Sequence, residues 1–441
     1  MKKIIPIILM SATSAFAADK IIDKDTSGEV IRTDTNYIIS GNDITYTNTH
    51  GPRHPISSTA FVLGSYTGTK FVSSAVIAPS SNNLPFFGLN GMQFKGDTVD
   101  ADITISVKEG ATPIAVQGGF TVDNCTAIFE KATDFLWSDT NVANINVKNG
   151  GYLDFKVSYV YSKQDPNNTS VLYTTTPLNA DKRVAFNIEN GSTMVANMGA
   201  GDYKLNASNF AGKVELTTAS GKYLYFSSGT SVISDQKTAD ASVFNCKLSL
   251  NGGSLLIDES NETSSIKVLS NYITMFSGTL TLNASNALRT VNGTNGQKDV
   301  VIEVGGGRTV SLVLGADNDL RILDQNNSAS VLNVTLAGNH LSALTTKVEN
   351  SDLDTLGIVY FTDFEEGLVK IENVDDSKIS DETTYLTTCF KGGTKDSNFD
   401  LYWNPETKYL TAFAVPEPAE WAVVLGALAI AFVFMRRQTR K

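Results

Sequence analysis

Cysteine is scarce in this sequence of 441 residues, which limits the kinds of site and cross-link that the chain can form. Cys125, Cys246 and Cys389 lie far apart in the sequence, and no pair has the spacing of metal ligands. Three cysteines cannot all pair with one another. The sequence is therefore compatible with one long-range disulfide or with buried free thiols. Folding stability must therefore come mainly from apolar burial and backbone pairing.

Histidines and paired acids that could act in catalysis are also few. His50, His54 and His340 are the only histidines. The first two lie beside glycine or proline in a turn-rich loop, and His340 follows Gly338-Asn339 at a turn. The adjacent acids Asp375 and Asp376 would point to opposite faces of a strand, so they would not converge on one glycosidic bond. The sequence predicts no catalytic residue.

A basic surface and phosphate-binding or metal-binding motifs are missing as well. The formal net charge of −11 argues against binding nucleic acid or an anionic membrane through bulk charge. Gly305-Gly306-Gly307-Arg308 lacks the lysine and hydroxyl residue of a phosphate loop. Asp317-Asn318-Asp319 is a single copy of a calcium-like spacing, for which we expect a plain turn. No cofactor or metal is predicted.

The N-terminus has the three zones of a secretory signal peptide. Lys2 and Lys3 precede a short apolar stretch, which is followed by small residues ending at Ala15-Phe16-Ala17. Small side chains at Ala15 and Ala17 fit the pockets of a signal peptidase, so the sequence predicts cleavage before Ala18. The segment 1–17 is then absent from the mature chain.

The C-terminus carries an uncharged apolar run followed by a basic cluster. The run extends from Trp421 to Met435, includes the small residue Gly426, and predicts a transmembrane helix. Its 15 residues would cover about 22 Å of a hydrocarbon core of about 30 Å, so the span is short. The basic cluster is expected on the cytoplasmic side, with the rest of the chain outside that membrane. Its members are Arg436, Arg437, Arg440 and Lys441.

Directly before this run lies Pro416-Glu417-Pro418, which cannot continue a strand or a helix and should form an extended, accessible peptide. The order of this motif, apolar span and basic tail over residues 415–441 resembles the PEP-CTERM sorting signal of Gram-negative bacteria. The resemblance implies that an exosortase, a membrane cysteine transpeptidase, cuts near the motif and passes the chain to the cell surface. It also implies an organism that makes extracellular polysaccharide.

Between the two ends, the sequence alternates apolar and polar residues and predicts an all-β fold. Ile103-Thr104-Ile105-Ser106-Val107 is one example of this strand-forming alternation. Glycine-rich turns separate apolar segments at Asn149-Gly150-Gly151, Asn190-Gly191-Ser192 and Asn251-Gly252-Gly253. The only helical pattern outside the ends is a short piece around 127–137.

These turns belong to a degenerate strand-turn-strand repeat, as in residues 145–157, 186–195, 248–257 and 301–314. A single coil of this kind cannot cover its own apolar face, whereas stacked coils bury a continuous core. The repeat therefore predicts a right-handed parallel β-helix, or β-solenoid, with capping regions, and an antiparallel β-sandwich array stays open as the alternative. The pattern resembles the β-solenoids of autotransporter passengers and adhesins.

The predicted organisation has five parts. These are a signal peptide over 1–17, a β-rich N-terminal cap over 18–99, solenoid repeats over 100–349, a β-rich C-terminal cap over 350–414 and a sorting signal over 415–441.

From this organisation we expect a non-enzymatic structural or adhesive protein at the surface, or in the extracellular matrix, of a Gram-negative bacterium. Signal peptidase and exosortase are the expected partners during export, when the tail anchors the chain transiently in the inner membrane. Extracellular polysaccharide is the expected setting, and nucleic acid is excluded. The alternative is a secreted polysaccharide lyase or glycoside hydrolase on a β-helix scaffold.

Overall fold

The structure is a computed structural model of the chain. It describes residues 18–29, 31–32, 34–49, 56–57, 59–74, 87–108, 111, 114–132, 142–157, 164–165, 168–171, 183–198, 203–218, 222–234, 242–258, 267–268, 272–284, 287–288, 300–324, 330–337, 344–347, 358–372, 386–412, 425–432 and 435.

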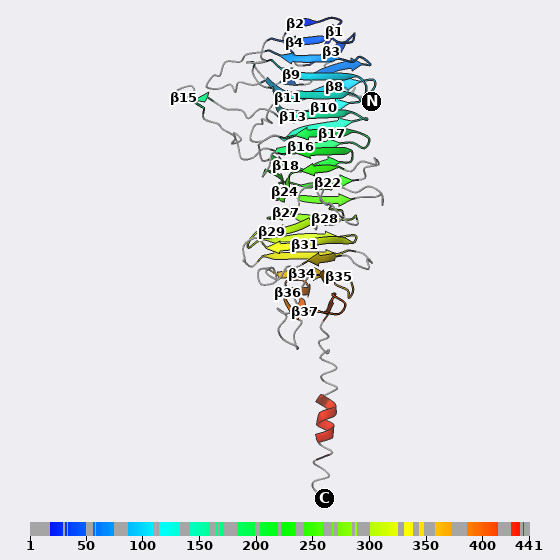
Figure 1. Cartoon of the computed structure of the whole chain (residues 1–441), viewed down its shortest axis with the longest axis vertical. Helices are drawn as coiled ribbons and strands as arrows, with labels where there is room; N and C mark the ends of the chain where they lie inside the picture. Colours follow the sequence, from blue (N-terminus) through cyan, green and yellow to red (C-terminus); the bar gives the residue numbers. More distant parts are fainter. Residues whose placement is uncertain are drawn as a thin grey trace, which may run out of the picture.

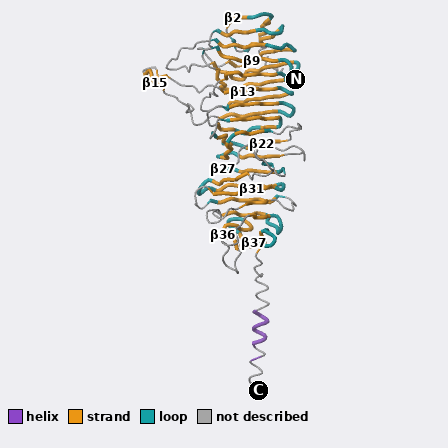
Figure 2. Tube along the Cα trace, in the orientation of Figure 1, coloured by secondary structure: helices purple, strands orange, loops and turns teal. Residues whose placement is uncertain are grey.

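The described residues form an elongated stack of β-coils, in which strands dominate and pair in parallel along the long axis (Figures 1 and 2). The larger sheet, sheet A, has a first column of strands that runs the length of the stack. This column contains β1 (Ala18–Ile22), β3 (Thr35–Ile39), β5 (Ile56–Ser57), β6 (Ala60–Gly64), β8 (Phe87–Gly96), β10 (Ile114–Asp123), β12 (Ala143–Lys148), β16 (Arg183–Ile188), β18 (Tyr203–Leu205), β21 (Tyr223–Phe226), β24 (Lys247–Leu250), β27 (Tyr272–Met275), β29 (Val300–Val304), β31 (Asn318–Asp324), β33 (Leu344–Lys347) and β35 (Val369–Glu372).

Sheet B lies along the first part of the stack and contributes the second strand of each coil there. It contains β2 (Thr26–Glu29), β4 (Thr45–Asn48), β7 (Thr69–Ser73), β9 (Asp102–Val107), β11 (Thr126–Ala132), β13 (Tyr152–Val157), β17 (Thr193–Asn197), β20 (Lys213–Thr217), β23 (Val243–Asn245) and β26 (Lys267–Val268). A separate antiparallel hairpin is formed by β14 (Gln164–Asp165) and β15 (Asn168–Val171).

The strands on either side of a glycine-rich turn do not pair with each other. Strand β12 pairs in parallel with β10 and β16, whereas β13, which follows the turn, pairs in parallel with β11 and β17. At this turn Asn149 and Gly150 have φ angles of 53° and 79°, so the chain turns a corner into the other sheet. The parallel registers confirm a solenoid-like all-β fold and rule out the antiparallel sandwich array for the described coils.

The core fills the space inside the coils because inward and outward residues alternate along each strand. In β12, for example, Ile145 and Val147 are fully buried while Asn144 is exposed. Aromatic rings stack from coil to coil near the N-terminal end. Tyr37 and Phe61 lie with ring centroids 5.2 Å apart, and Phe61 and Phe94 lie 6.2 Å apart. Each coil therefore covers the apolar face of its neighbour.

Sheet A splits into two columns after β16. The first half of β16 pairs with β18, and its second half pairs with β19 (Asn209–Phe210). Between these two short strands, the buried Ser208 hydroxyl accepts a hydrogen bond from the Phe186 backbone N–H at 3.1 Å. The hydroxyl thus takes the place of a strand partner for this N–H at the bend. The second column continues with β22 (Thr230–Ser234), β25 (Ser254–Asp258), β28 (Thr279–Leu282), β30 (Thr309–Leu314), β32 (Val331–Leu336), β34 (Ile358–Thr362) and β36 (Leu386–Gly393).

The two ends of the stack are built differently from each other. The parallel ladder already begins at β1, so residues 18–99, for which the sequence predicts a β-rich cap, contain strands in register with the later coils. At the other end, β36 pairs in antiparallel fashion with β37 (Asn398–Trp403), which pairs with β38 (Leu410–Ala412). This antiparallel unit packs on the last coil, where the buried Trp403 indole donates a hydrogen bond to the Ile371 carbonyl oxygen at 3.3 Å.

Two helical predictions can be compared with the structure. The described part of 127–137 is strand β11, in which Ala127 and Phe129 face the core and Ile128 does not, so the expected short helix is wrong. At the C-terminus, residues 425–432 and 435 are helical. Within the described part of the chain, no helix has both the length and the apolar character that a membrane span requires. The flanking residues 421–424 and 433–434 lie outside the described residues.

Candidate functional site

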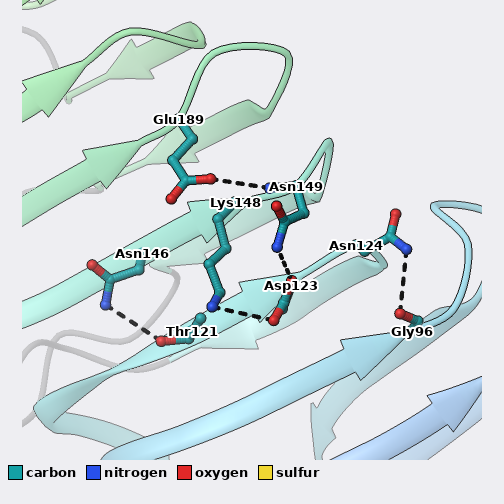
Figure 3. Close-up of polar contacts among 8 residues, drawn as sticks. All are labelled: Gly96, Thr121, Asp123, Asn124, Asn146, Lys148, Asn149 and Glu189. Carbon is teal, nitrogen blue, oxygen red and sulfur yellow. Dashed lines mark hydrogen bonds and ion pairs between the residues drawn. The ribbon is translucent and has the colours of Figure 1, made fainter.

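Sheet A presents a row of outward polar side chains, which we call the asparagine ladder. Thr121, Asn146, Asn187 and Asn209 are register neighbours on β10, β12, β16 and β19. The Asn146 amide donates to the Thr121 hydroxyl at 3.3 Å (Figure 3), and the Asn209 amide donates to the Asn187 carbonyl oxygen at 3.4 Å. The ladder thus uses its polar groups to connect successive coils.

A charged row lies beside this ladder at the corner of the coils (Figure 3). Lys148 forms an ion pair with Asp123 at 3.2 Å, and the Asn149 amide donates to the same carboxylate at 2.6 Å. The Asn149 backbone donates to Glu189 of the following coil at 3.2 Å. The contacts of Lys148 and Asn149 therefore join three successive coils, which favours a structural role for this row.

The outer face of sheet B carries a second surface, which we call the sheet B platform. It consists of three outward residues from each of three adjacent strands, which parallel register places in a three-by-three grid. Its members are Tyr152, Asp154 and Lys156 on β13, Thr193, Val195 and Asn197 on β17, and Lys213, Glu215 and Thr217 on β20. The sequence places them there because the intervening Leu153, Phe155, Met194, Ala196, Val214 and Leu216 are buried in the core.

Within the sheet B platform, each acid has a lysine on its own strand. Lys156 Nζ lies 2.8 Å from Asp154 Oδ2, and this hydrogen bond raises the pKa of the lysine amine. Lys213 Nζ lies 3.4 Å from Glu215 Oε1. Burial raises the pKa of the Tyr152 phenol, and the nearby carboxylates of Asp154 and Glu215 raise it further. The platform thus combines two acids, two bases and a phenol that stays protonated at neutral pH.

The spacing of the two platform acids bears on what chemistry they can perform. Asp154 and Glu215 are both register neighbours of Val195, so two strand spacings, about 9.6 Å, separate their Cα atoms. Inverting glycosidases hold their two carboxyl groups about 6.5–9.5 Å apart. General acid catalysis also requires a carboxyl group turned toward the bond that is cleaved, whereas Asp154 and Glu215 each face a lysine on their own strand. The arrangement is better suited to holding a polar ligand than to protonating one.

Other reactive groups in the described part of the chain do not assemble into a site. Cys125 and Cys246 are free and buried, and burial raises the pKa of both thiols, that of Cys125 to about 12. Among the described residues, no group of three histidines, cysteines or acids could hold a metal ion. The Asn318 amide is buried and donates to the backbone oxygens of Ala284 and Ala316, so its described role is structural.

The structure describes few of the residues singled out from the two ends of the sequence. Ala18, the expected first mature residue, is the first residue of β1. Gly426 lies in the helix over 425–432, and Met435 is also helical. The remaining predicted processing residues lie outside the described residues, as do the three histidines and the pair Asp375 and Asp376. These processing residues are Ala15, Ala17, Pro416, Glu417, Pro418, Trp421, Arg436, Arg437, Arg440 and Lys441.

The sheet B platform was not found from the sequence, although a signal for it exists. The alternating segments 152–157 and 213–217 each place an acid and a lysine at outward positions two residues apart. Recognising the platform also requires knowing that β17 lies between β13 and β20, and this neighbourhood appears only in the register. Adjacent acids in the sequence, such as Asp375 and Asp376, therefore give no indication of the platform, whose two acids come from strands far apart in the chain.

Comparison with known proteins gives no further identification, because no family model, curated protein or solved structure matches this chain.

Proposed function

We propose that this protein is an exported structural or adhesive component of a bacterial cell surface or extracellular matrix. In this proposal the signal peptide and the PEP-CTERM-like tail supply the address, and a right-handed β-helix forms the rod between them. Parallel strands joined by crossovers are right-handed in about 98% of cases, which supports this hand. The tail, including its transmembrane helix, is removed by an exosortase after export.

The observation that carries the proposal is the continuous parallel ladder, which links fifteen strands from β1 to β35 through the first column of sheet A. A rod of this kind exposes a long polar flank and depends only on contacts between neighbouring coils. The asparagine ladder and the charged row strengthen these contacts on the outside. Such a rod suits a mechanical or adhesive role at a cell surface.

Mass spectrometry of the protein recovered from the surface of its own host tests the processing. We expect a chain that starts at Ala18 and ends near Pro418, because both segments beyond these points serve export. Replacing Pro416, Glu417 and Pro418 with alanine should leave the basic tail attached and reduce surface delivery at least tenfold. Glu420→Ala, outside the motif, serves as the control. An intact 436–441 tail on mature wild-type surface protein would contradict the proposal.

A second candidate function, a carbohydrate-active enzyme, is favoured by one observation, that Asp154 and Glu215 lie on the same face of sheet B with only strand β17 between them. This function requires that the purified protein release reducing ends or unsaturated products from a polysaccharide. It also requires that Glu215→Gln, which keeps the shape of the side chain and removes its charge, abolish that release. Turnover that Glu215→Gln leaves unchanged would exclude the platform as its active site.

A further inference from the structure

We propose that the sheet B platform binds a segment of neutral polysaccharide chain. The assignment rests on the proposed function, because it names the surface through which the exported rod contacts a carbohydrate matrix. It concerns the outward residues of β13, β17 and β20 and requires no catalytic step.

The first argument is the distribution of apolar and polar groups on the platform. Val195 lies at the centre of the grid, and the Tyr152 ring lies at one corner. Around Val195 are carboxylates that accept hydrogen bonds, ammonium groups that donate them, and an amide that does both. A sugar ring has apolar C–H faces and hydroxyl groups at its edge that donate and accept. An aromatic and aliphatic floor with polar groups around it matches that pattern.

The second argument is charge. The platform carries two lysines and two acids, so its formal charge is zero, whereas the whole chain carries −11. An anionic polysaccharide would meet the field of an acidic protein without a compensating basic patch at this surface. A neutral chain pays no such cost and can use both the carboxylates and the ammonium groups as hydrogen-bond partners.

The third argument is an acceptor that the described protein leaves unsatisfied. Asp154 Oδ2 is paired with Lys156, but Asp154 Oδ1 is enclosed and accepts no hydrogen bond within the described part of the chain. The ion pair at Oδ2 is a surface contact, because the Lys156 side chain is 53% exposed, so a ligand hydroxyl can displace the lysine from that oxygen. On sheet A, by contrast, polar groups within the asparagine ladder and within the charged row already bond to their neighbours on adjacent coils.

Affinity electrophoresis and calorimetry on the purified full-length mature protein test the proposal. The probes are three neutral polysaccharides, mixed-linkage β-glucan, xylan and galactomannan, with polygalacturonate as the anionic comparison. We expect at least one neutral probe to bind and polygalacturonate to bind at least tenfold more weakly. Tyr152→Ala and Glu215→Gln should each weaken binding of the neutral probe at least tenfold.

Tyr225→Ala is the matched control, because Tyr225 is an outward tyrosine of sheet A, stacked on Tyr223 with centroids 5.4 Å apart. It should bind like the wild type. Circular dichroism and thermal unfolding establish that each variant keeps its fold, since all three positions face outward. A third platform variant, Val195→Asp, places a charge at the centre of the grid and should abolish binding without opening the core.

Three outcomes would overturn the assignment. These are failure of all neutral probes to bind, tighter binding of polygalacturonate than of any neutral probe, and platform variants that bind like Tyr225→Ala. Each of them leaves the proposed function intact if surface delivery and tail removal proceed normally. Failure of delivery in the wild-type protein would instead count against the proposed function, whatever the binding result.

Discussion

At the scale of single residues, the structure depends on positions where one coil approaches the next so closely that only glycine fits. Gly119 is such a position, because it lies at an irregularity in β10 with φ of 97°. A Cβ atom added there would lie 1.8 Å from the Asn144 backbone oxygen of β12. Both the backbone conformation and the inter-coil distance therefore require glycine.

We expect Gly119→Ala to lower the free energy of unfolding by about 3 kcal/mol or more, because the backbone strain and the clash with β12 add to each other. Gly191→Ala is the control. Gly191 has a similar φ of 83°, but nothing lies within 4 Å of an added Cβ, so a loss of about 1 kcal/mol is expected. Urea denaturation compares the two. Equal losses would show that the close approach of β10 and β12 contributes little.

Burial of the Cys125 and Cys246 thiols should make the folded chain less stable at alkaline pH. The pKa of Cys125 is about 12 in the folded chain against 9.0 for an unperturbed thiol, and burial also raises the pKa of Cys246. The unfolded chain thus releases these protons first, so stability is complete below pH 9 and falls as the pH rises above it. Each pH unit between 9 and 12 costs about 1.4 kcal/mol for Cys125.

The double variant Cys125→Ala, Cys246→Ala should therefore lose less stability than the wild type between pH 8 and pH 10.5. The expected difference is about 2 kcal/mol per cysteine at pH 10.5, measured by urea denaturation at each pH. Tyrosines and lysines titrate in both proteins, so the comparison isolates the thiols. Parallel pH profiles for the two proteins would contradict the assignment of buried, protonated thiols.

At the scale of the structural element, the corners between strands are held by serines of the following coil. The backbone N–H of Gly150 donates to Ser192 at 3.2 Å, that of Gly252 to Ser277 at 2.7 Å, and that of Gly307 to Ser330 at 3.0 Å. A glycine at a corner points its N–H along the stack, where no strand partner is available. The hydroxyl one coil further on satisfies it.

Ser330→Ala should cost about 1–3 kcal/mol, since the buried hydroxyl bonds both the Gly307 N–H and the Gly305 carbonyl oxygen. Ser277→Ala removes a similar bond at a partly exposed corner, where water can replace the hydroxyl, so a smaller loss is expected. Thermal unfolding of both variants measures the difference. A larger loss of stability in Ser277→Ala than in Ser330→Ala would show that solvent access to the corner does not determine how much stability the hydroxyl contributes.

The elements also show what could be predicted from the chain. The alternating segments and the glycine turns at 149–151, 190–192 and 251–253 correctly predicted strands and corners, because both depend on local geometry. The segment around Ala127 was misread as helical, since a short apolar run has no clear period. Its neighbours β9 and β13 decide that it is a strand.

At the scale of the whole molecule, the parallel ladder determines the shape. Fourteen strand spacings of about 4.8 Å between β1 and β35 give a rod body of about 67 Å, to which the antiparallel unit of β37 and β38 adds. Small-angle scattering of the mature protein should therefore give a skewed distance distribution that extends beyond about 70 Å. A symmetric distribution ending below that length would contradict the stacked coils.

The sequence by itself determined the all-β character, the corners and the inward and outward faces of the repeats, because these follow from side-chain alternation and from glycine conformations. It also supplies the predictions for the two ends, which concern export and stay predictions. Only the tertiary structure decided which strands are neighbours, how sheet A splits after β16, and that Asp154, Val195 and Glu215 share one face. Parallel neighbours are separated by whole coils of variable length, so no local pattern in the chain encodes their register.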